Sequence, residues 1–360
     1  MITIFTTAKP FCGHSGMIQR NALESWNRLH ADAEVILFGD EEGAAEAARE
    51  LGIRHVAEVE RANSSGEKRQ DTSSGAEARL VVEYLLSHLS TSSGQALKVR
   101  PEVPEQTFGF GAGNAQRPKI LRSFFDEAQR IARHELICYV NCDIVLPRDF
   151  LHAVNAVDAV HGRFLMVGRR WNVNVEKPLL FGEQGWEQEL TERALSVWEQ
   201  SSGDWIDYFV FRRGFYLGQM PEMVIGRVYW DQWLVWKARE AGAAVVDASA
   251  AVMAIHQNHD YGYHPAGKAG VWTDQLARRN YELAGGRWHL RTIDDATHVL
   301  GPGGLEENPE RRKRAAARIL KTAKQAAWMA AVDWTRPVRR RLQEKRGSAT
   351  ESQSHRGETE

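Results

Sequence analysis

The sequence predicts an α/β fold in which a mostly parallel sheet is flanked by helices. Short apolar segments of strand length alternate with longer segments of helical periodicity, and this alternation is the main basis for the prediction. β-α-β units of this kind build parallel sheets with helices on their faces. The length of 360 residues and the 43% of hydrophobic residues suit a globular α/β chain with additions, and they exclude a wholly disordered protein.

The first sixty residues carry the alternation most clearly. Residues 2–7, 34–38 and 54–58 are predicted strands, and residues 17–29 and 41–51 are predicted helices between them. The second helix stops at a glycine, which commonly ends helices because it adopts the left-handed backbone without penalty. Three parallel strands are therefore expected at the start of the sheet.

Residues 61–118 interrupt this pattern. They begin with Ser/Gly-rich sequence, end with several glycines before a proline, and contain one predicted helix at 76–89. A connection of this length is either functional or partly flexible. We interpret it as an insertion, partly flexible, into the sheet domain.

Strands and helices alternate again after the insertion. Predicted helices are at 120–133, 150–161, 186–198, 232–241 and 275–283, and predicted strands are at 135–141, 164–167, 206–211, 244–246 and 251–255. We therefore expect one sheet domain over residues 1–300, with the insertion at 61–118.

The end of the chain differs from the rest in charge. Residues 1–300 hold 32 basic and 39 acidic residues, whereas residues 309–346 hold 13 Lys/Arg against 3 acidic residues. We expect a basic helical extension at 301–346 and a disordered tail at 347–360. Because clustered Lys and Arg are attracted to anionic lipid, 309–346 is expected to make peripheral membrane contact. The alternative is that 309–346 packs on the acidic body, residues 1–300. The mildly acidic charge of residues 1–300 gives no indication of nucleic-acid binding.

The chain is expected to be cytoplasmic, at the inner membrane face where the extension makes its contact. It opens directly on an apolar strand without a basic-then-apolar leader, and no run approaches the roughly 18–20 apolar residues of a spanning helix. Its three cysteines, Cys12, Cys138 and Cys142, are too few for a disulfide framework. They also lack the Cys-x-x-Cys spacing of a thiolate zinc site.

Polar residues follow three of the predicted strands. Thr6 and Thr7 end the first strand, Asp40 follows the second, and Asn141 and Asp143 follow the strand at 135–141. In an open α/β sheet, ligands bind outside the carboxyl ends of the strands. A carboxylate placed there can hold a divalent cation, which in turn binds a diphosphate. The alternative is a plain strand and turn, with Asp143 capping a helix.

Seven short motifs occur in order along residues 1–60 and 119–300. They are Ile4-Phe5-Thr6-Thr7, Ile36-Leu37-Phe38-Gly39-Asp40, Tyr139-Val140-Asn141-Cys142-Asp143, Val167-Gly168-Arg169-Arg170-Trp171, Ile206-Asp207-Tyr208-Phe209-Val210-Phe211, Trp230-Asp231 and Ile255-His256-Gln257-Asn258-His259-Asp260-Tyr261. With these motifs the chain resembles nucleotide-diphospho-sugar transferases of the GT-A fold, close to bacterial family-2-like glycosyltransferases. The resemblance implies a GT-A-like, Rossmann-type catalytic domain over 1–300.

The resemblance also implies roles for the polar strand ends. Thr6, Thr7 and Asp40 resemble the residues that receive the base and ribose of the nucleotide. Asn141 and Asp143 resemble the family's signature, which faces the ribose, the diphosphate and a divalent metal, Mn²⁺ or Mg²⁺. The usual Asp-x-Asp motif has Asn141 in its first position here, which leaves Asp143 as the expected metal ligand.

Further residues are implied on the acceptor side. Asp231 resembles the carboxylate that acts as base in inverting members, and His256 resembles a histidine that completes the metal coordination. Asp207 is a second candidate for catalysis, unless it pairs with a nearby arginine such as Arg212 or Arg213. A zinc site at His256 and His259 is disfavoured, because the two histidines follow a strand and lack the helical His-Glu-x-x-His arrangement.

The expected function is transfer of a sugar from a nucleotide-diphosphate donor to a hydroxyl of a glycan or lipid-linked acceptor. Arg169 and Arg170 either hold a phosphate or acceptor anion or make structural ion pairs. A sugar-phosphate nucleotidyltransferase is one alternative, although the loop after the first strand offers a single lysine, Lys9. A non-catalytic nucleotide-sugar-binding protein is the other.

Overall fold

A computed structural model describes residues 1–62, 117–183, 185–197, 200–203, 205–260, 267–310 and 313. The chain divides into two units, Met1–Glu307 and Asn308–Glu360. The expected helix at 76–89, nearly all of the insertion and most of the basic extension and tail lie outside the described residues. Among the helices described, none has the length and hydropathy needed to cross a membrane.

One sheet forms the centre of the first unit, and its strands lie in the order β11-β10-β8-β6-β7-β4-β1-β2-β3. The bounds are β1 Ile2–Thr7, β2 Glu34–Phe38, β3 Arg54–Val56, β4 Leu136–Val140, β6 Phe164–Val173, β7 Ile206–Arg212, β8 Ala244–Asp247, β10 His298–Gly301 and β11 Gly304–Glu307. Only β7 and β11 run antiparallel to their neighbours in this order. The predicted α/β class with a mostly parallel sheet is confirmed.

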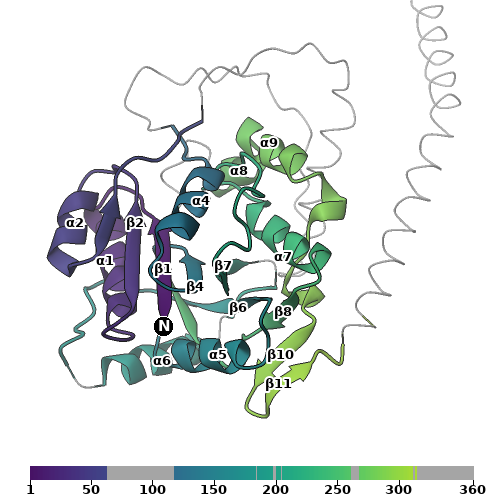
Figure 1. The fold of residues 1–360 in the computed structure, drawn as a ribbon. Coiled ribbons are helices and arrows are strands. Elements are labelled where there is room, and N and C mark those ends of the chain that lie inside the picture. Colours follow the sequence, from purple (N-terminus) through teal and green to yellow (C-terminus); the bar gives the residue numbers. More distant parts are fainter. Residues whose placement is uncertain are drawn as a thin grey trace, which may run out of the picture. The chain divides into compact units, whose positions relative to one another are not determined.

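Helices cover both faces of this sheet (Figure 1). Their bounds are α1 Gly13–Asn27, α2 Ala44–Leu51, α4 Leu121–Ile131, α5 Asp149–Asp158, α6 Trp186–Val197, α7 Trp230–Glu240, α8 Gly267–Thr273 and α9 Gln275–Leu283, with short 3₁₀ turns at Arg287–His289 and Ile293–Asp295. The predicted helices before residue 62 and after residue 119 are all present, with ends shifted by a few residues.

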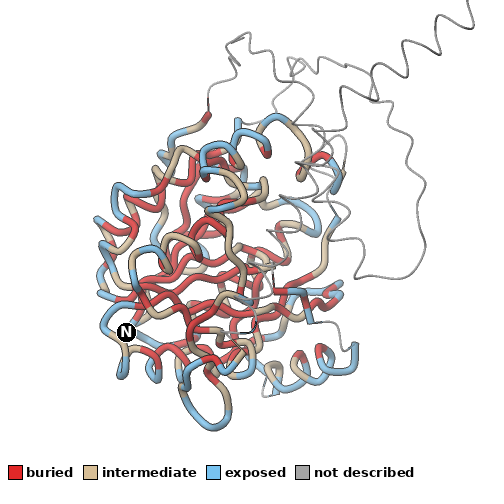
Figure 2. Tube along the Cα trace, turned by 90° about the vertical axis from the view of Figure 1, so that its right-hand side faces the viewer, coloured by how far each residue is buried: buried red, intermediate tan, exposed pale blue. Residues whose placement is uncertain are grey.

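Alternate residues of the central strands face two separate cores. Ile4 of β1 belongs to a core packed by α1, α2 and α5, whereas Phe5 belongs to a core packed by α4 and α7. Successive side chains of a strand point to opposite faces, so a strand that is apolar throughout must be covered on both sides. Figure 2 shows the buried residues, in red, concentrated along the interior strands.

Tertiary pairing creates strands that local sequence did not indicate. β6 extends to Val173 instead of ending at Val167, because β9, Ala254–Gln257, pairs with its polar half. The two-residue strand β5, Ile144–Val145, pairs with β9 on its other side. The hairpin of β10 and β11 places the end of the sheet at Glu307, beyond the expected 300.

Candidate functional site

The ends of β1, β4 and β7 meet at one edge of the sheet. The Thr6 hydroxyl donates a hydrogen bond to the Val140 carbonyl at 2.6 Å, which ties the end of β1 to the end of β4. The backbone N–H of Asn141 donates to the carbonyl of Asp207 at 2.9 Å, which ties β4 to β7. The sheet therefore brings Thr6 and Asn141, from two of the predicted strand ends, together with Asp207, which lies near the start of the antiparallel strand β7.

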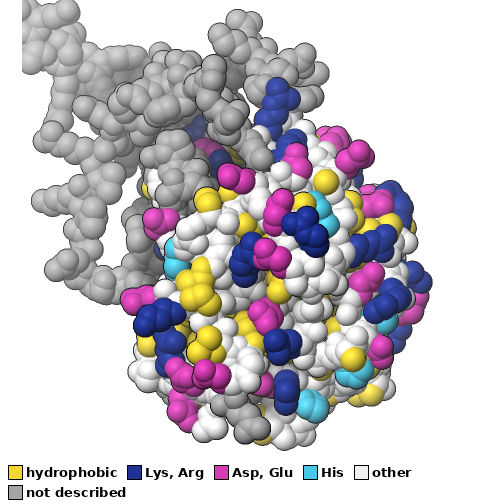
Figure 3. All heavy atoms as spheres, turned by 90° about the vertical axis from the view of Figure 1, so that its left-hand side faces the viewer, with side chains coloured by type: hydrophobic (Ala, Val, Ile, Leu, Met, Phe, Trp, Pro, Cys, Tyr) yellow, Lys and Arg dark blue, Asp and Glu magenta, His cyan; other side chains and the backbone are white. Residues whose placement is uncertain are grey.

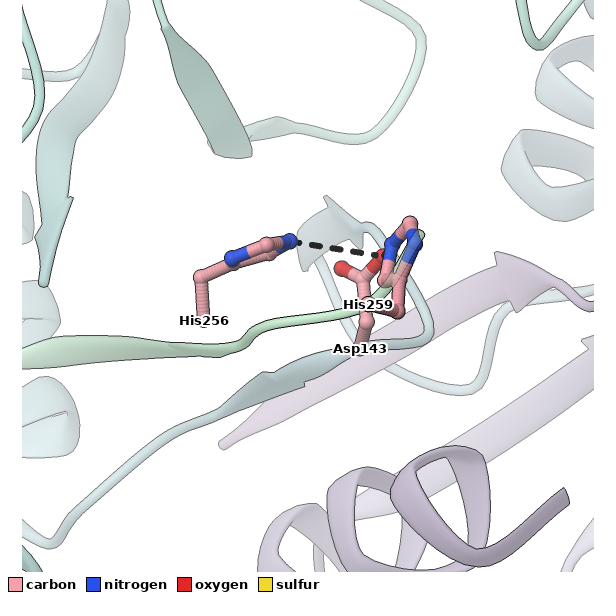
Figure 4. Close-up of side chains that lie close together, drawn as sticks. All are labelled: Asp143, His256 and His259. Atoms are coloured by element: carbon pink, nitrogen blue, oxygen red, sulfur yellow. Dashed lines mark hydrogen bonds and ion pairs between the residues drawn. The ribbon is translucent and has the colours of Figure 1, made fainter. Parts of the chain in front are cut away.

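Asp143, His256 and His259 form a compact cluster beside this edge. Asp143 lies between β4 and β5, and β5 pairs with β9 so that Ile144 is opposite His256. Nε2 of His259 lies 3.0 Å from Oδ2 of Asp143, and Nε2 of His256 lies 3.9 Å from the same oxygen. One ligand atom from each residue falls within 4.8 Å of the other two. Figure 4 shows the two rings on either side of the carboxylate.

The electrostatics of this cluster suit a cation. Burial by itself would raise the pKa of Asp143, but the hydrogen bond from His259 and the nearby positive groups outweigh it and hold that pKa far below its ordinary value. Burial lowers the pKa of His256 to about 4, so this imidazole is neutral at pH 7. An ionised carboxylate beside a neutral imidazole is the protonation state that metal binding requires.

Two buried atoms of the cluster, Oδ1 of Asp143 and Nδ1 of His256, have no hydrogen-bond partner among the described residues. A buried charged oxygen left unpaired is costly, so such atoms call for a cation, a water or a ligand. Asp143, His256 and His259 together supply oxygen and imidazole nitrogen donors, which fit a divalent metal such as Mn²⁺.

Asp207 is buried within a network of hydrogen bonds. It pairs with Arg170 at 2.7 Å and accepts a second bond from the side-chain amide of Asn141. The Tyr139 hydroxyl donates to the other end of that amide at 2.9 Å. Both carboxylate oxygens of Asp207 are therefore engaged. The sequence suggested Arg212 or Arg213 as the ion-pair partner of Asp207. In the structure, Arg212 pairs with Asp158 and Arg213 pairs with Glu135.

Thr7 and Asp40 lie on the β1–β2 side of the same edge. The Lys119 ammonium donates to the Thr7 hydroxyl and lies 2.6 Å from the Glu41 carboxylate, and both of these charged side chains are buried. Asp40 is exposed and forms an ion pair with Arg61, which also reaches Glu41 at 3.0 Å. The hydrogen bond from Arg61 and its charge hold the pKa of Asp40 below its ordinary value.

A cavity of about 550 Å³ opens beside Asp40. It is lined by Asp40, Ala57, Glu58, Val59, Glu60 and Arg61, which come from the end of β2 and the segment after β3. Its charged lining residues include both acidic side chains and one arginine, Arg61, so it can offer both acceptors and donors to a ligand.

Asp231 lies in the first turn of α7. The residue before this helix, Tyr229, has a φ of 85°, which is unusual for a residue other than glycine. Trp230 then packs edge-on against Tyr139, with ring centroids 5.3 Å apart.

Sequence reasoning missed two members of the site. His259 was considered only for a zinc site, which was disfavoured from the sequence, yet of the two histidines it lies closer to the Asp143 carboxylate. Its i, i+3 spacing from His256 could have indicated that the two histidines act together. Lys9 follows β1, and its charge acts on Asp143, although burial lowers the pKa of the lysine. Both histidines were expected to follow a strand, but His256 lies within β9.

Comparison with known proteins gives matches in structure alone. No protein-family model matches the chain, and no curated protein is similar to it in sequence. Glucosyl-3-phosphoglycerate synthase from Mycobacterium tuberculosis is similar over 79% of this chain and 81% of that one, with 11% identity and a TM-score of 0.40. The structure of the same enzyme with Mg²⁺ and uridine diphosphate is similar over 72% of each chain, with 12% identity and a TM-score of 0.35.

Staphylococcus aureus TarS, residues 1–349, is also similar, with 11% identity and a TM-score of 0.31. The match covers 72% of this chain and 58% of that one, so the chain spans little more than half of the TarS fragment. At these identities and TM-scores, the matches assign neither an activity nor a ligand to this chain.

Proposed function

We propose that the chain is a metal-assisted glycosyltransferase, which transfers a sugar from a nucleotide-diphosphate donor to an acceptor hydroxyl. The observation that carries the proposal is the Asp143, His256 and His259 cluster at the carboxyl ends of the strands, with a buried carboxylate oxygen that accepts no hydrogen bond from the described part of the chain. Ligands of open α/β sheets bind at this edge.

The cluster would hold a divalent cation through Oδ2 or Oδ1 of Asp143 and the imidazoles of His256 and His259. When bound, the ion would stabilise the diphosphate leaving group as a Lewis acid. The two imidazoles favour Mn²⁺ over Mg²⁺, which prefers an all-oxygen shell. Lys9, whose charge already acts on Asp143, would add a second positive group beside the diphosphate.

The nucleotide would lie on the β1–β2 side of the metal. Thr6, Thr7 and Asp40 belong to that side, and an open cavity lies beside Asp40. Asn141 would face the ribose and diphosphate, and its amide is already oriented by Asp207 and Tyr139. A preoriented amide loses little freedom on binding, which favours affinity.

Asp231 is our first candidate for the base that accepts the proton of the acceptor hydroxyl. Asp207 is the second, because both of its oxygens are engaged by Arg170 and Asn141. A base must reach the acceptor proton directly or through one water. Binding of the acceptor would therefore have to place its hydroxyl beside one of these two carboxylates.

We also propose that residues 309–346 draw the enzyme to an anionic membrane surface in the cytoplasm, where a glycan or lipid-linked acceptor would lie. The support is the charge of this segment, 13 basic against 3 acidic residues. The alternative to membrane binding is that residues 309–346 bind the acidic body of the same chain, residues 1–300. Figure 3 shows one face of that body, where Lys/Arg and Asp/Glu side chains are interspersed, so this face offers no extended acidic surface.

A donor screen tests the proposed function directly. The full chain would be incubated with a panel of nucleotide sugars and Mn²⁺, and release of nucleoside diphosphate would be measured with and without a mixture of acceptors. Slow hydrolysis of one nucleotide sugar, accelerated by acceptor, is expected. Release of pyrophosphate from a nucleoside triphosphate and sugar phosphate would instead indicate a nucleotidyltransferase, and no turnover of any donor would indicate a binding protein.

A further inference from the structure

Two cations and two tryptophans gather on the β6 side of the candidate metal cluster. The Arg170 guanidinium lies 4.7 Å from the centre of the Trp205 ring, and the Lys268 ammonium lies 4.6 Å from the centre of the same ring. The Lys268 ammonium also lies 5.4 Å from the Trp272 ring, which meets Trp205 edge-on. Both cations are within the range of cation–π attraction.

The local fold explains how these groups are held. The segment before β7 is fastened to β6 by the backbone of Arg170, which exchanges hydrogen bonds with the backbone and side chain of Ser201. This fastening places Trp205 beside Arg170. Lys268 and Trp272 are four residues apart on α8, so they share one face of that helix. The arrangement therefore joins three separate segments.

The two cations are close enough to repel each other. Burial lowers the pKa of Lys268, and the charge of Arg170 lowers it further. Arg170 is buried and paired with Asp207, whereas Lys268 is exposed at the rim. A guanidinium carries five N–H donors, so the pairing with Asp207 is compatible with a second anionic partner. An anion within reach of both cations would be attracted by both.

The cluster lies beside the candidate metal but away from the nucleotide side. In the sheet order, β6 and β7 are on one side of β4, while β1 and β2, which carry Thr7 and Asp40, are on the other. Asn172 is the register partner of His256, and Arg170 is two residues earlier on the same strand. Strand spacing then puts the Cα atoms of Arg170 and His256 about 8 Å apart.

We infer that Arg170, Lys268 and Trp205 form an acceptor subsite that binds a phosphate or carboxylate group on the acceptor. This inference rests on the proposed function in naming the ligand an acceptor. It makes the substrate an anionic hydroxyl compound, because both cations lie over the Trp205 ring, where they compete with the stacking that a neutral sugar ring would need. Arg170 would form the floor of the subsite and Lys268 its rim.

Ligand-observed NMR on the full chain tests the subsite without requiring turnover. Saturation transfer would be titrated with glycerol phosphate, with lactate as a carboxylate, and with glycerol as the uncharged control. The variants are Lys268→Ala and the matched control Lys237→Ala, since Lys237 also lies over a tryptophan, Trp236, at 5.9 Å. Both lysines are on helices, and Lys268 is exposed, so neither variant should disturb folding.

Wild type and Lys237→Ala should bind at least one of the two anions, and Lys268→Ala should bind it roughly tenfold more weakly, as expected for loss of one charge-assisted contact. Glycerol should bind to none of them. Equal binding of glycerol and glycerol phosphate, or equal affinities of Lys268→Ala and wild type, would overturn the inference. A short-chain phosphatidylglycerol, which carries both a phosphate and free hydroxyls, distinguishes the sources in a parallel titration. A response to glycerol phosphate indicates a soluble acceptor, and one confined to the lipid indicates a headgroup; either supports the subsite.

Titration of nucleoside diphosphates with Mn²⁺ in the same proteins separates this inference from the proposed function. Lys268→Ala should keep the affinity of wild type for the nucleotide. Anion binding in a protein that takes no nucleotide would preserve the subsite and contradict sugar transfer. Nucleotide binding in a protein that binds no anion would contradict the subsite and leave the proposed sugar transfer in place.

Discussion

Replacement of Lys119 by methionine should destabilise the protein strongly. The Lys119 ammonium lies 2.6 Å from the Glu41 carboxylate, and their side chains are 5% and 4% exposed. It also donates to the carbonyl of Ala8 at 2.9 Å, which fixes the chain after β1. Methionine keeps the length of the side chain but removes the charge, so Glu41 remains buried with Arg61 as its cationic partner.

Loss of one partner of a buried ion pair costs about 3–5 kcal/mol, because the remaining charge stays out of water. Arg61 still reaches Glu41, so we expect the lower end, about 3 kcal/mol, for Lys119→Met. Urea unfolding followed by circular dichroism measures the change. Lys237→Met is the matched control, because its pair with Glu240 is exposed to solvent and its loss should change the free energy of unfolding far less.

The double variant Lys119→Met, Glu41→Gln measures the interaction between these two charges separately from their interactions with other residues. If the two charges stabilise each other, the double variant should lose less than the sum of the single variants. Additive losses, or a loss below about 1 kcal/mol for Lys119→Met alone, would refute the reasoning that this buried pair fixes the chain after β1.

Three further predictions concern catalysis, pH and the extension. Asp231→Asn should lower sugar transfer by roughly 10²–10⁴-fold and leave nucleotide binding intact, measured by product formation and calorimetry; unchanged turnover would point to Asp207. Because the pKa of His256 falls from 6.5 to about 4 on folding, the unfolded state alone takes up this proton between those values, so the free energy of unfolding should decrease as pH falls from 6.5 to 4. His256→Gln should flatten that part of the profile in urea titrations; an unaltered slope would show that another group titrates. The full chain should co-sediment with anionic liposomes at low salt, and a chain ending at Asn308 should not, with neutral liposomes as the control. Equal recovery of both chains in the supernatant would contradict membrane attraction.

The sequence predicted the elements whose patterns are local. The apolar strand at Ile2–Thr7 and the helix at Gln275–Leu283 match their predicted bounds, because each is defined by its own periodicity and flanking residues. Polar residues at the ends of β1 and β4 were enough to predict that Thr6, Asn141 and Asp143 would meet at one edge. Parallel strands bring their carboxyl ends to the same side whatever the loops between them.

Features that depend on a distant partner could not be predicted in this way. The polar half of β6 becomes a strand because β9 supplies its hydrogen bonds, and the pairing partner of Asp207 is Arg170, from a different strand. Likewise, Lys268 and Trp205 are 63 positions apart, and each alone resembles an ordinary surface or packing residue. Only the tertiary fold shows that they share one site.

Calorimetric titration of nucleoside diphosphates into wild type and Asp143→Ala, with and without Mn²⁺, tests the central claim most directly. Wild type should bind one nucleoside diphosphate more tightly when Mn²⁺ is present, and Asp143→Ala should lose that increase while keeping its thermal unfolding cooperative. Asp32→Ala, which removes an exposed carboxylate elsewhere, should behave like wild type. The same metal-dependent affinity in Asp143→Ala as in wild type would show that the cluster does not hold the metal, and it would contradict the proposed function at its basis.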